Sequence, residues 1–457
     1  MPLSVRGNLV PARTLPPIEE YWPMNSKPSL ALILILMLFL ALHALYNWAT
    51  PLGEGPDEPG HLAYVLFVAF EQRLPLQRPP PATSDVPGEG HQPPLAYLLA
   101  APLVAWLPPD ERDIYLHPNP DFVWAGGAEP GAFVRASREL WPWHGLPLAW
   151  HVVRAVSGLA GAATVALTFL AARRLAPHDP RLATLAALLV ALHPQFLFTS
   201  ALVSNDALLA ALGAALLWHS LAQPQAPERW ALLAGMLFGL ALLTKQSALL
   251  LGPLLLVATW RISGGAWRQA LRLSLRWMVV TLLVAGWWYA RNLWLYGDPF
   301  GLNLFQQKFT TQAFAWGDAA AWQSALRQLF GSYWARFGWM NIHPPAWMLW
   351  GYALLCGVAF AGWLRRDAQD APARGNTDAK AQRREGAKQG KVNTKALRVG
   401  AATLKTSLAQ KSLGLTKGRP VASTSSANDP RPELFRAKTR FQKGAFRFTI
   451  CSADFSR

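Results

Sequence analysis

Apolar stretches of membrane length, or close to it, recur along the chain up to about Leu364. The hydrocarbon core of a bilayer is about 30 Å thick, and a helix of roughly 20 apolar residues crosses it. The pattern predicts eight such helices, at residues 29–46, 150–172, 182–203, 207–222, 230–243, 247–260, 277–290 and 346–364. We therefore expect an all-α polytopic membrane protein with about eight transmembrane helices.

The charges between these segments support this count. Arginines occupy alternate connections: Arg173, Arg174 and Arg181, then Arg229, then Arg261, Arg268, Arg272 and Arg276, and finally Arg365 and Arg366. The other connections hold 15 of the 19 acids of residues 1–364. Because cytoplasmic loops are enriched in Lys and Arg, the Arg-rich side and residues 1–28 are predicted to be cytoplasmic. A single long helix over 230–260 would reverse this asymmetry.

The outer connections differ in length. Residues 47–149 and 291–345 form two long outer loops within a transmembrane domain that spans residues 29–364. The first loop is expected to contain interfacial helices. Residues 61–70 are apolar and predicted to lie along the membrane, whereas the 13 apolar residues 95–107 suit a half-inserted or interfacial helix.

Composition agrees with a membrane protein up to about residue 364. The chain is 52% hydrophobic and 15% charged, where soluble domains carry about 25% charged residues. Its 22 Trp are typical of an interfacial aromatic belt. The two cysteines, Cys356 and Cys451, indicate neither a disulfide nor a thiolate metal site.

The excess of positive charge belongs to the end of the chain. Residues 365–457 contain 21 Lys and Arg against 7 Asp and Glu, which supplies +14 of the net +17. This composition predicts a disordered basic tail, cytoplasmic and able to contact anionic membrane lipids. No aromatic-interleaved module indicates a nucleic-acid partner. The abrupt change at Arg366 suggests a frameshifted or recombined gene end, and hence a truncated enzyme.

The unusual polar residues gather on the predicted outer face. The adjacent acids Asp57 and Glu58 follow the first span, and Lys245 interrupts an apolar run as the only lysine between Lys27 and Lys308. The others are His91, Gln92, Arg154, Asn205, Asp206, Arg291 and Asp298. A carboxylate there could act as a general base, and the cations could bind a phosphate.

Each of these residues also has an ordinary explanation. The acid pair suits a solvated loop or a helix N-terminus, and Asn205-Asp206 suits an N-cap. Lys245 could be a snorkelling lysine, and the arginines could be interfacial anchors. His91 and Asp298 fit turns. The functional interpretation rests on their shared face.

The sequence has no P-loop, GxGxxG, HExxH or cysteine cluster. A nucleotide-sugar donor bound in a soluble Rossmann domain is therefore not expected, and any donor should come from the membrane.

The order of these motifs resembles the GT-C superfamily of membrane glycosyltransferases, in the bacterial branch of protein O-mannosyltransferases and aminoarabinose transferases. The motifs are Asp57-Glu58-Pro59 with His61 and Tyr64, Gln92-Pro93-Pro94-Leu95-Ala96-Tyr97, Arg154, Asn205-Asp206, Leu242-Leu243-Thr244-Lys245, and Arg291-Asn292 with Tyr296-Gly297-Asp298-Pro299. The resemblance covers residues 29–364.

The resemblance implies an inverting transfer from a polyprenyl-phosphate-linked sugar to a lipid, glycan or protein acceptor. It would occur outside the bacterial inner membrane. Asp57 would be the base or would orient the acceptor, with Glu58 second. Lys245 and Arg291 would hold the departing lipid phosphate. No cofactor is implied, and a divalent metal requirement is left open.

The chain departs from the family pattern in two places. Gln92, preceded by His91, stands where aminoarabinose transferases often have a lysine, and the apolar pattern stops at Leu364 where members usually continue. An inactive truncated homologue is one alternative. The other is a non-catalytic membrane scaffold or transporter, although a transporter should show repeated halves and polar residues inside its spans.

Overall fold

The computed structural model describes residues 29–123, 131–308 and 314–365. The chain separates into two compact units, one ending at Pro345 and the other beginning at Ala346. The described part of the second unit is a single helix, Ala346–Arg365. The predicted disordered tail, 365–457, lies outside the described residues except for its first residue, as does the predicted cytoplasmic segment 1–28.

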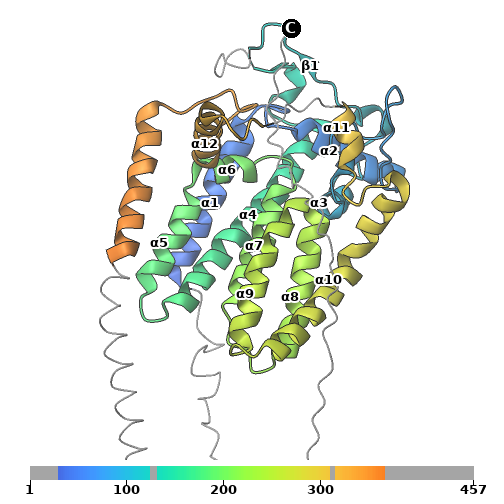
Figure 1. Ribbon diagram of the computed structural model, residues 1–457. Helices are drawn as coiled ribbons and strands as arrows, with labels where there is room; N and C mark the ends of the chain where they lie inside the picture. Colours follow the sequence, from blue (N-terminus) through green and yellow to red (C-terminus); the bar gives the residue numbers. More distant parts are fainter. Residues whose placement is uncertain (1–28, 124–130, 309–313, 366–457) are drawn as a thin grey trace, which may run out of the picture. The chain divides into compact units, whose positions relative to one another are not determined.

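The first unit is mostly helical (Figure 1). Its longer helices are α1 (Leu30–Ala49), α4 (Gly145–Leu175), α5 (Pro180–Ala191), α6 (Pro194–Ser200), α7 (Asp206–Ser220), α8 (Pro227–Thr244), α9 (Gly252–Ile262) and α10 (Trp267–Tyr296). A 3-10 turn, η6 (Gln246–Leu251), leads into α9. Each of the eight predicted segments falls on helix, the last of them on Ala346–Arg365, and the described chain is mostly helical with one short pair of strands.

Fewer helices than the predicted eight are long and apolar enough to cross a membrane. Four described helices are long and apolar enough to cross a bilayer: α1, α4, α10 and Ala346–Arg365. A fifth is reached if α5 and α6, which meet at a 61° bend, form one broken span. The 15 residues of α7 extend about 22 Å, less than the hydrocarbon thickness. The structure therefore supports four to five spans and does not show eight.

The bend between α5 and α6 has a local cause. Pro194 is the first residue of α6, where it needs no backbone donor, and the Nδ1 of His193 accepts a hydrogen bond from the Phe196 amide at 3.2 Å. This cap starts a new helix in a new direction.

Two glycines allow α8 and α10 to approach closely. A Cβ at Gly235 would lie 2.4 Å from the carbonyl oxygen of Trp277, and one at Gly239 would lie 2.7 Å from Val284. The Thr281 hydroxyl then donates to the Gly235 carbonyl at 3.1 Å. Small residues four apart favour such close packing of membrane helices.

The two long connections, after α1 and after α10, contain short elements: α2 (Glu58–Glu71), η2 (Glu89–His91), α3 (Leu95–Ala100), η3 (Ala101–Leu103), η4 (Pro109–Glu111), β1 (His117–Pro118), β2 (Phe133–Val134), η5 (Ser137–Glu139), α11 (Leu302–Lys308) and α12 (Ala319–Trp334). The strands pair antiparallel. In Figure 1 α2, α11, α12 and β1 lie at one end of the longer helices of this unit. The predicted helices at 61–70 and 95–107 are present, the second as a short α-helix continued by a 3-10 turn.

Candidate functional site

The adjacent acids Asp57 and Glu58 have opposite surroundings. Glu58 is fully buried, whereas Asp57 is exposed. Asp57 precedes α2 in the left-handed conformation (φ 58°), which short polar residues adopt more readily than most. The two carboxylates are therefore suited to different tasks.

Glu58 forms a buried bidentate ion pair with Arg154 of α4. The Nε of Arg154 donates to Oε1 at 2.7 Å, one terminal nitrogen donates to Oε2 at 2.7 Å, and both side chains are 0% exposed. The Val203 amide also donates to Oε1 at 2.9 Å. This pair ties the turn after α1 to α4 and to the segment before α7.

The remaining donors of Arg154 are also occupied. They donate to the carbonyl oxygens of Asn47, Thr50 and Pro51 at 3.2, 2.7 and 3.0 Å. A guanidinium has five N–H groups, and all five have an acceptor here. In this arrangement Arg154 has no donor left for a substrate phosphate.

Lys245 lies in the break between α8 and η6, beside the first residue of α7. Its ammonium is 2.5 Å from Oδ1 of Asp206, and both side chains reach solvent, with 26% and 42% exposed. The side-chain amide of Asn205 donates to the Thr244 carbonyl at 3.1 Å. This bond joins the turn before α7 to the end of α8. An ammonium has three donors, so Lys245 can bind a further anion while it contacts Asp206.

Asp57 belongs to the same electrostatic group as Lys245 and Asp206. Although Asp57 reaches solvent, partial desolvation of its carboxyl by the surrounding protein raises the pKa. The charge of Lys245 lowers this pKa, and the charge of Asp206 raises it. A carboxylate with a raised pKa is a better proton acceptor than a fully solvated one.

Glu89, His61 and Tyr97 form a buried cluster beside these charges. The Nδ1 of His61 is 2.8 Å from the Tyr97 hydroxyl and 3.8 Å from Oε2 of Glu89. Burial, followed by the negative charge of Asp57, raises the pKa of Glu89 to about 7. Burial lowers the pKa of His61 to about 3. Both groups are therefore neutral in mildly acidic solution.

Glu89→Gln is expected to make stability less dependent on pH. A carboxyl whose pKa rises from 4.5 to about 7 on folding destabilises the protein as pH rises through that window, by about 3 kcal/mol above pH 7. The variant should match the unaltered protein at pH 5 and exceed its melting temperature at pH 8. Thermal unfolding at several pH values measures this, and parallel pH profiles would contradict it.

His91 and Gln92 precede α3 and reach the same cluster. The Nδ1–H of His91 donates to the Gly88 carbonyl at 2.8 Å, and its ring packs against Phe305 with centroids 4.5 Å apart. The amide of Asn205 donates to Oε1 of Gln92 at 3.3 Å. The charge of Lys245 acts on His91 as well.

Arg291 and Asp298 make contacts with other residues. Arg291 donates to the Pro75 carbonyl at 2.9 Å and lies 5.1 Å above the Trp288 ring. The carboxylate of Asp298 accepts three backbone amides at the start of α11, those of Phe300, Leu302 and Asn303 at 3.0, 2.7 and 3.0 Å. That arrangement is the turn that its sequence first suggested.

The structure thus brings together six of the ten predicted site residues: Asp57, His91, Gln92, Asn205, Asp206 and Lys245. Glu58 and Arg154 form a separate buried pair, and Arg291 and Asp298 have partners of their own. Glu89 was not predicted. Its only sequence signal is an acid two residues before His91, in a stretch rich in Gly and Pro.

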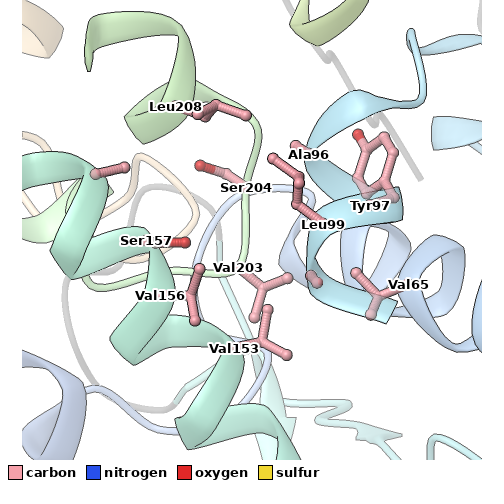
Figure 2. A pocket seen from close by; sticks show the side chains of 12 residues that line it. Val65, Ala96, Tyr97, Leu99, Val153, Val156, Ser157, Val203, Ser204 and Leu208 are labelled. Carbon is pink, nitrogen blue, oxygen red and sulfur yellow. The ribbon is translucent and has the colours of Figure 1, made fainter. Parts of the chain in front are cut away.

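This unit contains two cavities of interest. A hollow of about 850 Å³ is lined by the end of α1, by Glu54, by the β2 segment and by Phe337. Glu54 holds that wall in place by accepting the amides of Ala132 and Phe133, both at 3.1 Å. The second pocket, about 60 Å³ and mainly apolar, lies among valines beside Tyr97 (Figure 2). It is too small for a sugar.

Within the described residues, no three His, Cys, Asp or Glu side chains gather as metal ligands.

Residues 149–289 match the family model of dolichyl-phosphate-mannose-protein mannosyltransferases. Over these residues the chain is similar to that family. The resemblance predicted from the sequence is thereby confirmed. The matched segment runs from α4 into α10 and includes Arg154, Asn205, Asp206 and Lys245, whereas Asp57 and His91 precede it.

A solved structure of the protein O-mannosyltransferase Pmt1-Pmt2 complex of S. cerevisiae, bound to the sugar donor, is also similar. The identity is 17% and the TM-score 0.36, over 62% of this chain and 35% of that chain. The present chain thus spans about a third of the length of that protein. No curated protein matches the chain.

Proposed function

We propose that the chain is an inverting glycosyltransferase that moves a sugar from a polyprenyl-phosphate donor to an acceptor hydroxyl. One observation carries the proposal. The exposed acid Asp57 and the solvent-reaching cation Lys245 interact electrostatically on a chain with a segment similar to a GT-C family. The acceptor is a lipid, a glycan or a protein.

The proposed step uses Asp57 as the base. Its carboxylate takes the proton of the acceptor hydroxyl, and the acceptor oxygen forms a bond to the anomeric carbon of the donor. The bond between that carbon and the phosphate oxygen breaks, and the electron pair leaves with the polyprenyl phosphate. The raised pKa of Asp57 favours the first part.

Lys245 would stabilise the leaving group. Negative charge develops on the phosphate as the bond breaks, and an ammonium held nearby lowers the barrier. Arg291 is retained as a second phosphate ligand, because its bonds to the Pro75 carbonyl and to Asn292 use two of the five guanidinium donors. A positioning role is favoured for Glu58 and Arg154, because the two side chains bind each other in a buried ion pair.

The proposed location is the bacterial inner membrane, with residues 1–28 in the cytoplasm and Asp57 outside. The distribution of Arg between connections supports this orientation. The hollow beside Glu54, three residues before Asp57, is the proposed approach for the acceptor.

Lys245→Met is expected to lower kcat/KM for the donor by about 10²-fold or more, because a charge-assisted contact to the leaving phosphate is lost. Lys245→Arg keeps the charge and should retain more of the activity. The assay follows transfer of labelled sugar from a synthetic polyprenyl-phosphate donor by the protein in liposomes. Unchanged kinetics in Lys245→Met would exclude the phosphate role, and no transfer by the unaltered chain from any such donor would exclude the function.

A further inference from the structure

Helix α12 presents an apolar stripe that no described part of its own unit covers. Trp322, Leu326, Leu329 and Tyr333 recur at helical spacing and are 42%, 59%, 66% and 61% exposed. Positions 4, 7 and 11 residues apart share one face of a helix. The other side carries Gln323, Ser324, Arg327 and Gln328.

Only the C-terminal end of α12 is packed. The ring of Trp334 stacks on His193 with centroids 4.9 Å apart, and the Arg336 amide donates to Oε1 of Gln195 at 2.6 Å. Gly331 is its one buried residue. His193 and Gln195 lie at the start of α6, in the bent pair that counts as one candidate span. The helix is therefore attached where that span bends.

The N-terminal end of α12 carries an aromatic group. Phe314, Trp316 and Trp322 meet edge to face with ring centroids 5.0–5.5 Å apart. Trp at such a position is typical of the boundary between lipid and water, where an apolar ring and a polar N–H are both accommodated. Figure 1 shows α12 nearly end-on and α1, α4 and α7 from the side, so its axis runs across theirs.

We propose that α12 lies in the interfacial region of the bilayer with this stripe in contact with lipid. Its 16 residues extend about 24 Å, too short to cross, and the side opposite the stripe carries the polar residues Gln323, Ser324, Arg327 and Gln328. An amphipathic helix of this kind lies in the plane of the membrane. A contiguous exposed apolar patch marks a contact with a membrane or with another protein, and the aromatic group at the start of α12 favours the membrane.

The polar face of α12 predicts the kind of lipid surface. Arg327 is its only charged residue. Binding is therefore driven by apolar area and by the aromatic ring contacts, and it should occur on zwitterionic as well as on anionic lipid. A helix that recognises anionic headgroups would instead carry several Lys or Arg.

Site-directed spin labelling of the full chain tests this placement. In a background with Cys356→Ser and Cys451→Ser, single cysteines replace Leu326 or Leu329 on the stripe, and Ser324 or Gln328 on the opposite face. All four positions are exposed, so the substitutions should cost the fold little. Collision with oxygen reports contact with lipid, and collision with a water-soluble nickel complex reports contact with water.

In phosphatidylcholine liposomes the two stripe positions should favour oxygen, and the two polar positions should favour nickel by several-fold. Liposomes with anionic lipid should give the same pattern. Equal access of nickel to all four positions would overturn the proposal. Stripe positions closed to both reagents would also overturn it, because a second protein surface would then cover the stripe.

Discussion

Replacing Arg154 by methionine should destabilise the protein by about 3–5 kcal/mol, the usual cost of removing one partner from a buried ion pair. Glu58 would be left buried and charged with only the Val203 amide to bond it. Three backbone carbonyls would lose their donor. Thermal or denaturant unfolding in detergent measures the loss.

Two further variants separate charge from geometry. Arg154→Lys restores a charge but offers three donors where five are used, so it should recover only part of the stability. In the double variant Glu58→Gln, Arg154→Met no charge is buried, and it should be more stable than Arg154→Met alone. A single variant as stable as the unaltered protein would contradict the structural role of this pair.

The ion pair between Glu58 and Arg154 affects how the loss of activity in a Glu58 variant is interpreted. Glu58 holds the first turn of α2, and Asp57 is the residue before it. A Glu58 variant without activity could have lost the fold of the turn and not a reacting group. Unfolding measurements on the same variant distinguish the two cases.

The helices could be predicted from the sequence because their signals are local. Apolar runs, Pro194 and Pro227 at helix starts, and Gly297 after α10 mark the elements within a few residues. The number of spans was harder to predict. Hydropathy shows that residues 207–222 are apolar. Whether they span the membrane also depends on the length of the helix, and α7, with 15 residues, is shorter than a span.

The site was predicted in part because its residues share a face. The alternation of predicted spans places Asp57 and Lys245 on the same side of the membrane. The partners of Arg154 could not be predicted, since Glu58 and the carbonyls of Asn47, Thr50 and Pro51 are 96 to 107 residues away. Such pairing is set by the packing of α1 against α4. Glu89 was missed for the same reason, because its raised pKa comes from burial that no local pattern reveals.

Asp57→Asn should lower kcat of sugar transfer by about 10²–10⁴-fold, the usual contribution of a general base. Asparagine keeps the size of the side chain and cannot accept the acceptor proton. Stability should change little, because Asp57 is exposed and its side chain makes no capping hydrogen bond. Transfer of labelled sugar from a synthetic polyprenyl-phosphate donor is the measurement, and Asp113→Asn, at an exposed acid of the same connection between α1 and α4, is the matched control.

The pH profile gives this prediction a second readout. If Asp57 is the base, activity should rise with pH as its carboxyl loses its proton, and the raised pKa places this rise above the range of a solvated aspartate. The residual activity of Asp57→Asn should lack that rise. A variant that keeps full activity, or that keeps the same pH profile at lower activity, would exclude Asp57 as the base. The family segment at residues 149–289 would then have to be paired with a base from another part of the chain.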